Sequence, residues 1–525
     1  MDTKALRRKI LDLAIRGQLV PQDPADEPAS VLLDRIRAEK QKMVKEGKLK
    51  AKDIKNDSII FVGEDSLHYE KFADGSVKCI EDEIPFELPE GWAWARLGTV
   101  FSTVTGATPS TKDASLYGTD YPFYKPTDLD AGYNVCGAED SVSEKGYLSG
   151  RPLPKFSVLV TCIGATIGKT GYISNAGICN QQINAVLPNS EVLSDYTYFC
   201  MCSQYEQEQI WTNSSATTLP ILNKSKFDNL LFPIPPHEQQ SRIVERIKGL
   251  FFFVEKVQSN QESLKTTVGI AKSKILDLAI RGQLVPQDPN DEPASVLLER
   301  IRAEKEELIR QGKLKRDKKE SVIFRGDDNS YYEKVGGEVQ CIDNEIPFDI
   351  PETWAFVRLK HIGTVIGGGT PKTNVPSFWD GEIPWLTPAD LSGHKEIYVS
   401  AGGRNIKREG LDSSSAQLMP AGAVLYSSRA PIGYVAISAN PIATNQGFKS
   451  VVPYDFSMSE YLYYCLQART PDIEQRATGT TFKEISGSAM AETIIPLPPI
   501  AEQQRIVSCV QSYVEKLFVV EKQIN

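Results

Sequence analysis

The sequence lacks most of the signatures by which an enzyme is recognised. Its 525 residues contain no GxxxxGK[ST] phosphate loop and no [ND]PP[YFW] tetrapeptide, the motif that a DNA amino-methyltransferase carries beside its target base. The four histidines are scattered, and the nine cysteines form no CxxC pair, so we expect no metal site. No serine–histidine–aspartate or paired-carboxylate arrangement stands out. These absences argue against catalysis by this chain.

The sequence also lacks a membrane segment and an excess of positive charge. No stretch is apolar enough to span a bilayer, and the N-terminal residues MDTKALRRKILDLAIRG carry no signal-peptide run, so we expect a cytoplasmic protein with reduced thiols. Lysine and arginine number 59 against 68 aspartate and glutamate, a net charge of −9. Because a protein that holds DNA unaided is normally basic, this balance counts against an independent DNA binder.

What the sequence does contain is a long repeat. Residues 9–40 and 274–305 are identical at all but two positions. A unit used twice predicts two similar surfaces related by an approximate two-fold axis, and a partner or substrate that comes in two halves. The other matched blocks are 41–86 with 306–348, 87–100 with 349–365, and 233–244 with 496–507.

Between the matched blocks the two copies diverge strongly, which divides the chain into constant and variable regions. The pattern is that of a circle of two repeats cut open inside one constant region, so we expect the two ends of the chain to lie close together. The predicted regions are an N-terminal constant region (1–84), a first variable domain (85–233), a central constant region (234–345), a second variable domain (346–496) and a C-terminal constant helix (497–525).

The central constant region carries a heptad series that predicts one long helix over residues 236–282. At 1.5 Å per residue it would be a rod of roughly 65–70 Å. Matching apolar positions at both ends of the chain, including Leu6, Ile10 and Leu13, predict a second, antiparallel rod. The alternative is a set of separate amphipathic helices, each packed on its own domain. The predicted seam is Ile243, Ile247, Leu250, Val254, Val257, Leu264, Val268, Ile275 and Leu278, with Ile506, Val510 and Leu517 opposite.

Local patterns predict the remaining elements. We expect an amphipathic helix over 28–47 and two or three short strands over 58–80, with copies of both in the second repeat. The variable regions read as mixed α/β domains, each with one helical segment, at 195–211 and 459–475. Cys79 and Cys341 occupy matching repeat positions, and we expect both to be small core thiols.

The variable regions hold side chains suited to base edges and phosphates of DNA. Asparagine and glutamine can pair with adenine, and arginine with guanine. The same residues have simpler interpretations: the amides can tie a turn to the backbone, the cations can be solvated, and the run Gly367–Gly369 can be a plain turn. The candidates are Thr108, Ser110, Lys112, Lys125, Arg151, Lys155, Lys169, Asn180 and Gln181 in the first region, and Thr370, Lys372, Arg404, Lys407, Arg408, Arg429, Asn445 and Gln446 in the second.

The combination of PIPPHEQQSRIV, PLPPIAEQQRIV, LDLAIRGQLVPQDPxDEPASVLL, LPEGWAWARL and a GxTP turn resembles the specificity subunit of type I restriction–modification enzymes. The resemblance spans essentially the whole chain. It implies two target recognition domains that each read one half of a bipartite, asymmetric DNA site, separated by an antiparallel two-helix coiled coil. It also implies two methyltransferase subunits that bind S-adenosylmethionine and modify adenine, and restriction subunits that use ATP and Mg²⁺ to translocate and cut unmodified DNA, with no cofactor on this chain.

The negative charge fits this interpretation if the partner subunits supply much of the phosphate contact, which dominates non-specific affinity. This chain would then supply base discrimination. The first variable region departs from the expectation, since 14 acidic residues there outnumber 9 basic ones. Two other functions stay open at this point: a self-sufficient DNA methyltransferase, which the missing motifs disfavour, and a coiled-coil scaffold with two protein- or sugar-binding heads.

Overall fold

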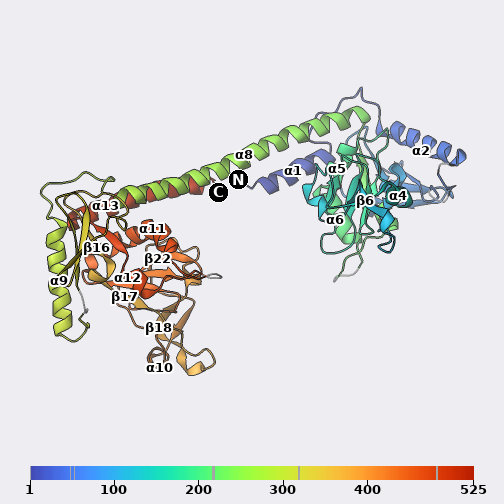
Figure 1. Ribbon diagram of the computed structural model, residues 1–525. Coiled ribbons are helices and arrows are strands. Elements are labelled where there is room, and N and C mark those ends of the chain that lie inside the picture. Colours follow the sequence, from blue (N-terminus) through green and yellow to red (C-terminus); the bar gives the residue numbers. More distant parts are fainter. Residues whose placement is uncertain are drawn as a thin grey trace. The chain divides into compact units, whose positions relative to one another are not determined.

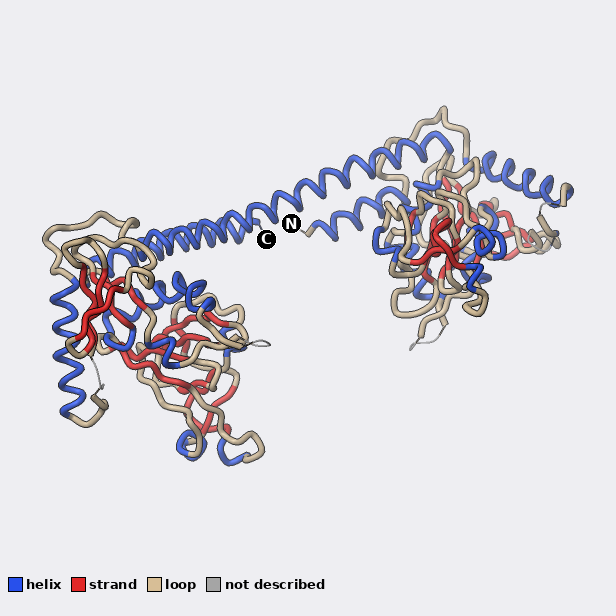
Figure 2. The backbone as a smooth tube through the Cα atoms, viewed as in Figure 1, coloured by secondary structure: helices blue, strands red, loops and turns tan. Residues whose placement is uncertain are grey.

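A computed structural model describes residues 2–47, 49–51, 54–215, 219–316, 320–479 and 483–524 (Figures 1 and 2). The chain forms two compact units, Met1–Gln261 and Glu262–Asn525, and the boundary lies within the 44-residue helix α8 (His237–Ile280). The long helix and the mixed α/β fold are as predicted. In the part of the chain that is described, no helix has the length and hydropathy needed to cross a membrane.

The first unit begins with constant-region elements. Asp2 caps α1 (Thr3–Ile15) by accepting hydrogen bonds from the backbone N–H groups of Lys4 and Ala5. Helix α2 (Ala29–Lys45) ends before Gly47, whose φ of 70° suits the residue after a helix. A three-stranded antiparallel sheet follows, as the sequence predicted for 58–80. Its strands are β1 (Ser58–Val62), β2 (His68–Phe72) and β3 (Val77–Cys79).

The variable region of the first unit is a globular head closed by its own first and last strands. Strand β4 (Ala93–Arg96) pairs antiparallel with β12 (Leu231–Ile234). A four-stranded sheet has the order β5 (Thr103–Thr105), β11 (Ile183–Val186), β8 (Val158–Thr161) and β9 (Thr170–Tyr172). A three-stranded sheet has the order β10 (Ile178–Cys179), β6 (Tyr117–Tyr124) and β7 (Asp140–Val142). The helices are α3 (Leu97–Val100), α4 (Glu144–Ser149), α5 (Ser194–Met201), α6 (Gln204–Asn213) and α7 (Lys224–Asp228).

The second unit repeats this plan. Helix α9 (Ala294–Arg310) precedes a sheet of β13 (Ser321–Arg325), β14 (Tyr331–Val335) and β15 (Glu338–Cys341). Strand β16 (Ala355–Arg358) pairs with β25 (Ile494–Leu497) and closes the head. One head sheet has the order β17 (Gly363–Gly367), β24 (Lys449–Pro453), β21 (Val424–Ser428), β22 (Ile432–Ser438) and β19 (Tyr398–Val399), and the other β20 (Arg404–Ile406), β18 (Trp379–Leu386) and β23 (Ala443–Thr444). The remaining helices are α10 (Arg408–Asp412), α11 (Ser459–Gln475), α12 (Gly487–Ala491) and α13 (Ile500–Ile524).

Antiparallel helix pairing is present within each unit. In the first, Arg7 of α1 lies 3.1 Å from Glu255 of α8, and Gln22 accepts from Gln239 at 2.9 Å, so α1 and α8 run in opposite directions. In the second, Lys272 of α8 contacts Glu521 of α13 at 2.9 Å. Of the predicted seam, the fully buried residues are Ile243, Ile247, Val254, Val268, Ile506 and Val510, and the half-buried ones are Leu250, Val257, Ile275, Leu278 and Leu517.

Leu264 departs from this seam, since 43% of its surface is exposed. In the antiparallel pairing Lys272 lies beside Glu521, and α13 ends only three residues later at Ile524. Leu264 lies about two turns before Lys272 on α8, and α13 ends before it reaches that level. No helix of the same unit therefore covers Leu264.

Two local expectations are wrong. Residues 195–211 form two helices, α5 and α6, because the Ser203 side chain accepts a hydrogen bond from the Glu206 N–H and starts a new helix; residues 459–475 do form one helix, α11. Cys79 and Cys341 are exposed rather than buried. They lie on β3 and β15, the edge strands of their sheets, whose residues are exposed along their whole length.

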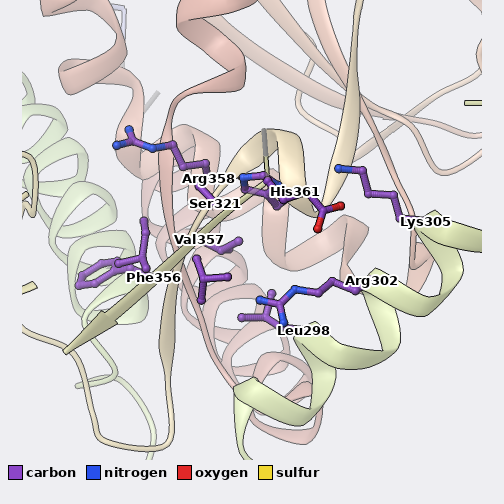
Figure 3. Close-up of a pocket in the computed structure, with 11 residues that line it drawn as sticks. Leu298, Arg302, Lys305, Ser321, Phe356, Val357, Arg358 and His361 are labelled. Carbon is purple, nitrogen blue, oxygen red and sulfur yellow. Dashed lines mark hydrogen bonds between the residues drawn. The ribbon is translucent and has the colours of Figure 1, made fainter. Parts of the chain in front are cut away.

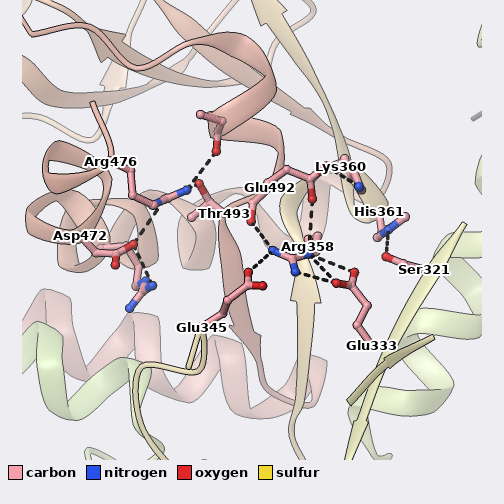
Figure 4. A network of polar contacts seen from close by, with 12 residues as sticks. Ser321, Glu333, Glu345, Arg358, Lys360, His361, Asp472, Arg476, Glu492 and Thr493 are labelled. Atoms are coloured by element: carbon pink, nitrogen blue, oxygen red, sulfur yellow. Dashed lines mark hydrogen bonds and ion pairs between the residues drawn. The ribbon is translucent and has the colours of Figure 1, made fainter. Parts of the chain in front are cut away.

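A buried arginine fixes each three-stranded sheet to its head. Arg358 of β16 donates to Glu333 of β14 at 2.6 Å, to Glu345 at 2.9 Å and to the Glu492 carbonyl oxygen at 3.1 Å (Figure 4). The hydrogen bonds that Arg358 donates to Glu333 outweigh burial and raise the pKa of the guanidinium. The first unit repeats the network around Arg96. Beside Arg358 a small cavity lies between α9, β13 and β16, lined in part by Leu298, Lys305 and His361 (Figure 3).

Candidate nucleic-acid interface

Two loops meet at one edge of each head, and we refer to them together as the loop pair. The TP turn is Gly106–Ser110 in the first unit and Gly368–Lys372 in the second. The NQ loop is Asn180–Gln182 in the first unit and Asn445–Gly447 in the second. Both loops contain candidates chosen from the sequence, and the fold brings them into contact in both units.

Glycine makes this contact possible. A Cβ atom on Gly106 would lie 2.1 Å from the Asn180 carbonyl oxygen, and one on Gly368 would lie 1.9 Å from the Asn445 carbonyl oxygen. Any other residue would clash with backbone, so these two glycines are required by close approach of the chain. The run Gly367–Gly369 is not a plain turn: Gly367 is the last residue of strand β17, Gly368 lies against the NQ loop, and Gly369 lies against Ser415 and Ala416.

A side-chain hydrogen bond joins the two loops in the same way in each unit. The Thr108 hydroxyl donates to the Gln181 amide oxygen at 2.6 Å, and the Thr370 hydroxyl donates to that of Gln446. All four side chains are exposed. The neighbouring asparagines serve the backbone instead, since the Asn445 side chain accepts from the Gly447 N–H at 2.8 Å. Asn180 accepts from the Gln182 N–H in the same manner, so the asparagines tie the turn and the glutamines remain accessible.

An aromatic side chain holds the TP turn from its other side. Tyr117, the first residue of β6, donates to the Pro109 carbonyl oxygen at 2.9 Å. Trp379, the first residue of β18, donates from Nε1 to the Lys372 carbonyl oxygen at 3.2 Å. The turn is therefore anchored on both sides, while its outer surface is exposed.

Beside the loop pair the two heads differ sharply in charge. Strands β6 and β7 have the same register and the same bulge as β18 and β20, which places Asp140 opposite Phe123 and Arg404 opposite Trp385. Asp140 and Arg404 thus occupy one position of the fold with opposite charge.

The reversal continues into the helix that follows each strand. Ser143 and Glu144 of the first unit correspond to Lys407 and Arg408 of the second, because α4 and α10 start at the same distance from the equivalent strands. In the second unit the side chains of Arg404, Lys407 and Arg408 are exposed, whereas Ile406 between them is buried. The segment therefore presents three cations in one head, and two acids with a serine in the other. The next residue reverses the pattern, with Lys145 in the first unit and Glu409 in the second.

The structure shows which candidate cations have partners. Arg404 lies 3.8 Å above the Trp379 ring, and the Arg151 guanidinium donates to the Thr105 carbonyl oxygen at 2.5 Å. Lys155 lies over the Phe156 ring. Ion pairs join Lys125 to Asp140, Lys169 to Asp130, Arg408 to Asp412 and Arg429 to Glu484. Within the described ranges, the side chains of Lys112, Lys372 and Lys407 form no hydrogen bond, ion pair or ring contact, and the Ser110 hydroxyl accepts from the Lys112 N–H.

Sequence reasoning missed the segment Asp140–Glu144 as a site. It named cations and uncharged polar residues, whereas the first unit carries acids at these positions. The two variable regions are too different in sequence to be aligned there. The equivalence of this segment with Arg404–Arg408 is visible only in the shared strand register.

The buried reactive side chains are not arranged for catalysis. Burial raises the pKa of the Cys162 thiol to about 12 and that of Cys465 to about 12, so both are neutral. Burial likewise raises the pKa of the Glu206 carboxyl, which accepts from Gln209 at 3.0 Å inside the core. Among the residues with assigned positions, no three His, Cys, Asp or Glu side chains are grouped to bind a metal ion. The site is suited to binding rather than to bond chemistry.

Comparison with known proteins gives a consistent result. The model of the family "Type I restriction modification DNA specificity domain" matches residues 89–264 and again 351–525. The chain is 25% identical to the EcoEI specificity subunit of a type I restriction enzyme from Escherichia coli, over 97% of this chain and 89% of that one.

Two further matches differ in extent. The MjaIX specificity subunit from Methanocaldococcus jannaschii is 44% identical over 34% of this chain, and the chain spans 41% of its length. A chain from a solved structure described as "Structural basis underlying complex assembly and conformational transition of the type I R-M system" shares the fold, with a TM-score of 0.56 and 20% identity over 84% of this chain and 94% of that one. The chain belongs to the type I restriction modification DNA specificity domain family and carries its domain twice.

Proposed function

We propose that this chain is the non-catalytic DNA specificity subunit of a type I restriction–modification complex, and that each head reads one half of a bipartite, asymmetric double-stranded DNA target. The observation that carries the proposal is the charge reversal at one position of the fold, Asp140 in the first head and Arg404 in the second. Asp140 is paired with Lys125, whereas Arg404 stacks on the Trp379 ring and keeps its positive charge exposed. Two heads of one fold that present different charge to the same place on DNA select different bases, so the two half-sites differ.

The recognition domains are the variable regions 85–233 and 346–496. Their boundaries are supported by the pairing of β4 with β12 and of β16 with β25, since each head is closed by strands close to its own two ends. A head closed in this way can be exchanged as a unit.

The near-identical constant regions support a second part of the proposal, that two identical methyltransferase subunits dock on this chain, one for each copy. S-adenosylmethionine would bind to those subunits, and ATP and Mg²⁺ to restriction subunits that join the complex in the cytoplasm. The partners would also supply phosphate contacts, which accounts for the net charge of −9 on this chain. The helix α8 would then set the spacing between half-sites.

The test is a map of modified sites in DNA from a host that expresses the system, repeated after residues 85–233 are replaced by another such head. We expect a bipartite motif whose one half changes while the other half and the spacer stay the same. Alteration of both halves would contradict the division between heads. Methyl transfer by the purified chain alone would favour a self-sufficient methyltransferase. A DNA affinity that does not increase when methyltransferase subunits are added would favour a scaffold with protein- or sugar-binding heads.

A further inference from the structure

The two heads share the loop pair, although they differ around it. In both units the threonine hydroxyl donates to the glutamine amide oxygen, a glycine lies against the carbonyl oxygen of the asparagine in the NQ loop, and an aromatic side chain holds the TP turn. Two different half-sites have two things in common: the sugar–phosphate backbone, which carries no sequence information, and the adenine that the proposed methyltransferase subunits would modify. Paired recognition of adenine uses both the oxygen and the nitrogen of a glutamine amide, and in both heads the threonine hydroxyl already binds that oxygen. The shared loop pair therefore fits the backbone better than the shared base.

The exposed groups of the loop pair suit an anion. Because the threonine hydroxyl occupies the amide oxygen of Gln181 or Gln446, the amide nitrogen, a donor only, remains for a ligand. A lysine without a side-chain partner in the described residues lies in the TP turn or just after it, Lys372 in the second unit and Lys112 in the first. Phosphate oxygens accept hydrogen bonds and attract cations, so the available groups match them.

Further basic groups lie beside each loop pair. In the first unit Arg151 donates to the carbonyl oxygen of Thr105, the residue before the TP turn. In the second, Lys449 lies 3.4 Å from the Gln446 carbonyl oxygen, although it also pairs with Glu484 at 3.2 Å. Each head therefore places positive charge close to its exposed glutamine, with different residues.

We propose that the loop pair of each head is a sequence-independent clamp on the DNA backbone, in which Gln181 and Gln446 donate to phosphate oxygens, and that base selection lies in the neighbouring segments Asp140–Glu144 and Arg404–Arg408. This division within each head rests on the proposed function. It assigns the side-chain amides of Gln181 and Gln446, which by themselves would suit adenine, to the DNA backbone instead.

The sharpest test is Gln446→Glu, with Gln181→Glu as its counterpart in the first head. The substitution keeps an oxygen to accept from Thr370, so the link between the loops persists and the melting temperature should not change. It replaces the outward N–H donor by negative charge, which phosphate repels. Gln340→Glu, which places the same charge on β15 of the same unit, is the matched control.

The variants are assembled with their methyltransferase subunits and titrated with duplexes that carry the mapped site or one altered half-site. We expect Gln446→Glu to weaken binding to all duplexes alike, by about tenfold or more, and to leave the map of modified sites unchanged. Lys372→Gln should reduce the slope of log affinity against log salt by about 0.9. The control should bind as the unaltered complex does.

Three results would overturn the proposal. Unchanged affinity in Gln446→Glu and Gln181→Glu would show that the glutamines only join the loops. A changed preference at one base of a half-site would make the loop pair a base reader. An unaltered complex that modifies no bipartite site would refute the proposed function itself, and the clamp with it.

Discussion

Substitution of Arg358 by methionine tests whether the buried ion network holds the second unit together. The Arg358 side chain is 8% exposed and that of Glu333 is 10%, whereas Glu345 and Glu492 are 42% and 46% exposed. The exposed pairs contribute at most about 1 kcal/mol each. The main cost therefore comes from Glu333, which would be left buried and charged without its partner.

Breaking such a buried pair typically costs about 3–5 kcal/mol, and replacing both members by apolar residues is often close to neutral. We therefore expect Arg358→Met to destabilise the second unit by about 3–5 kcal/mol, and Arg358→Met with Glu333→Met to recover most of that loss. Arg96→Met should do the same to the first unit, where Arg96 donates to Glu70 at 2.6 Å.

Hydrogen exchange measured by mass spectrometry at increasing urea concentrations is the appropriate assay, because it reports separately on peptides from β16 and β25 and on those from β4 and β12. Each single substitution should loosen the strands of its own unit only. A loss below about 1 kcal/mol, or a double variant as unstable as Arg358→Met alone, would refute the view that a buried unpaired Glu333 dominates the energetics.

Three further predictions concern pH and spacing. The hydrogen bonds from Arg358 lower the pKa of Glu333 below its ordinary 4.5, so the second unit should lose stability as pH falls below about 4.5. In Arg358→Met burial raises that pKa above 4.5, so urea titrations should show stability rising as pH falls toward 4.5, with no further loss from Glu333 below it. Burial raises the pKa of Glu502, which accepts from Trp354 at 2.9 Å, so the unit should lose stability as pH rises above 4.5 and Glu502 ionises. Glu502→Gln should remove this decline in urea titrations and stabilise the unit by about 1 kcal/mol at pH 7. Seven residues inserted between Val257 and Leu264 add about 10 Å of helix, and the methylation map should show a spacer longer by about three base pairs; an unchanged spacer would count against α8 as the ruler.

The first unit already carries a neutral residue at the position of Glu502. Gln239 takes the place of Glu502 in the first unit and accepts from Trp92 at 2.9 Å. A neutral amide therefore already fills this role, which is why the substitution should preserve the hydrogen bond to the tryptophan.

The sequence by itself determined the features that depend on neighbours along the chain. The repeat fixed the two-unit plan, the heptads predicted the long helix, and the Asp-Gly pair within 58–80 predicted two or three short strands, which the structure shows as a three-stranded sheet. Helical and strand periodicities record which face of an element is buried, so they can be read without knowing the partner. The heptads also predicted that Leu264 is part of the seam, but it is exposed. The position at which α13 ends, rather than the heptad pattern, decides whether Leu264 is covered.

Only the tertiary structure decided the site. Lys125 looked like a free cation until the fold placed Asp140 beside it, and Asn180 looked like a base reader until its side chain was seen to accept from Gln182. Both contacts are made by folding, so composition could not reveal them. The equivalence of Asp140 with Arg404 is a matter of strand register, which hydrogen bonds between distant strands define and which persists when almost every side chain around it has changed.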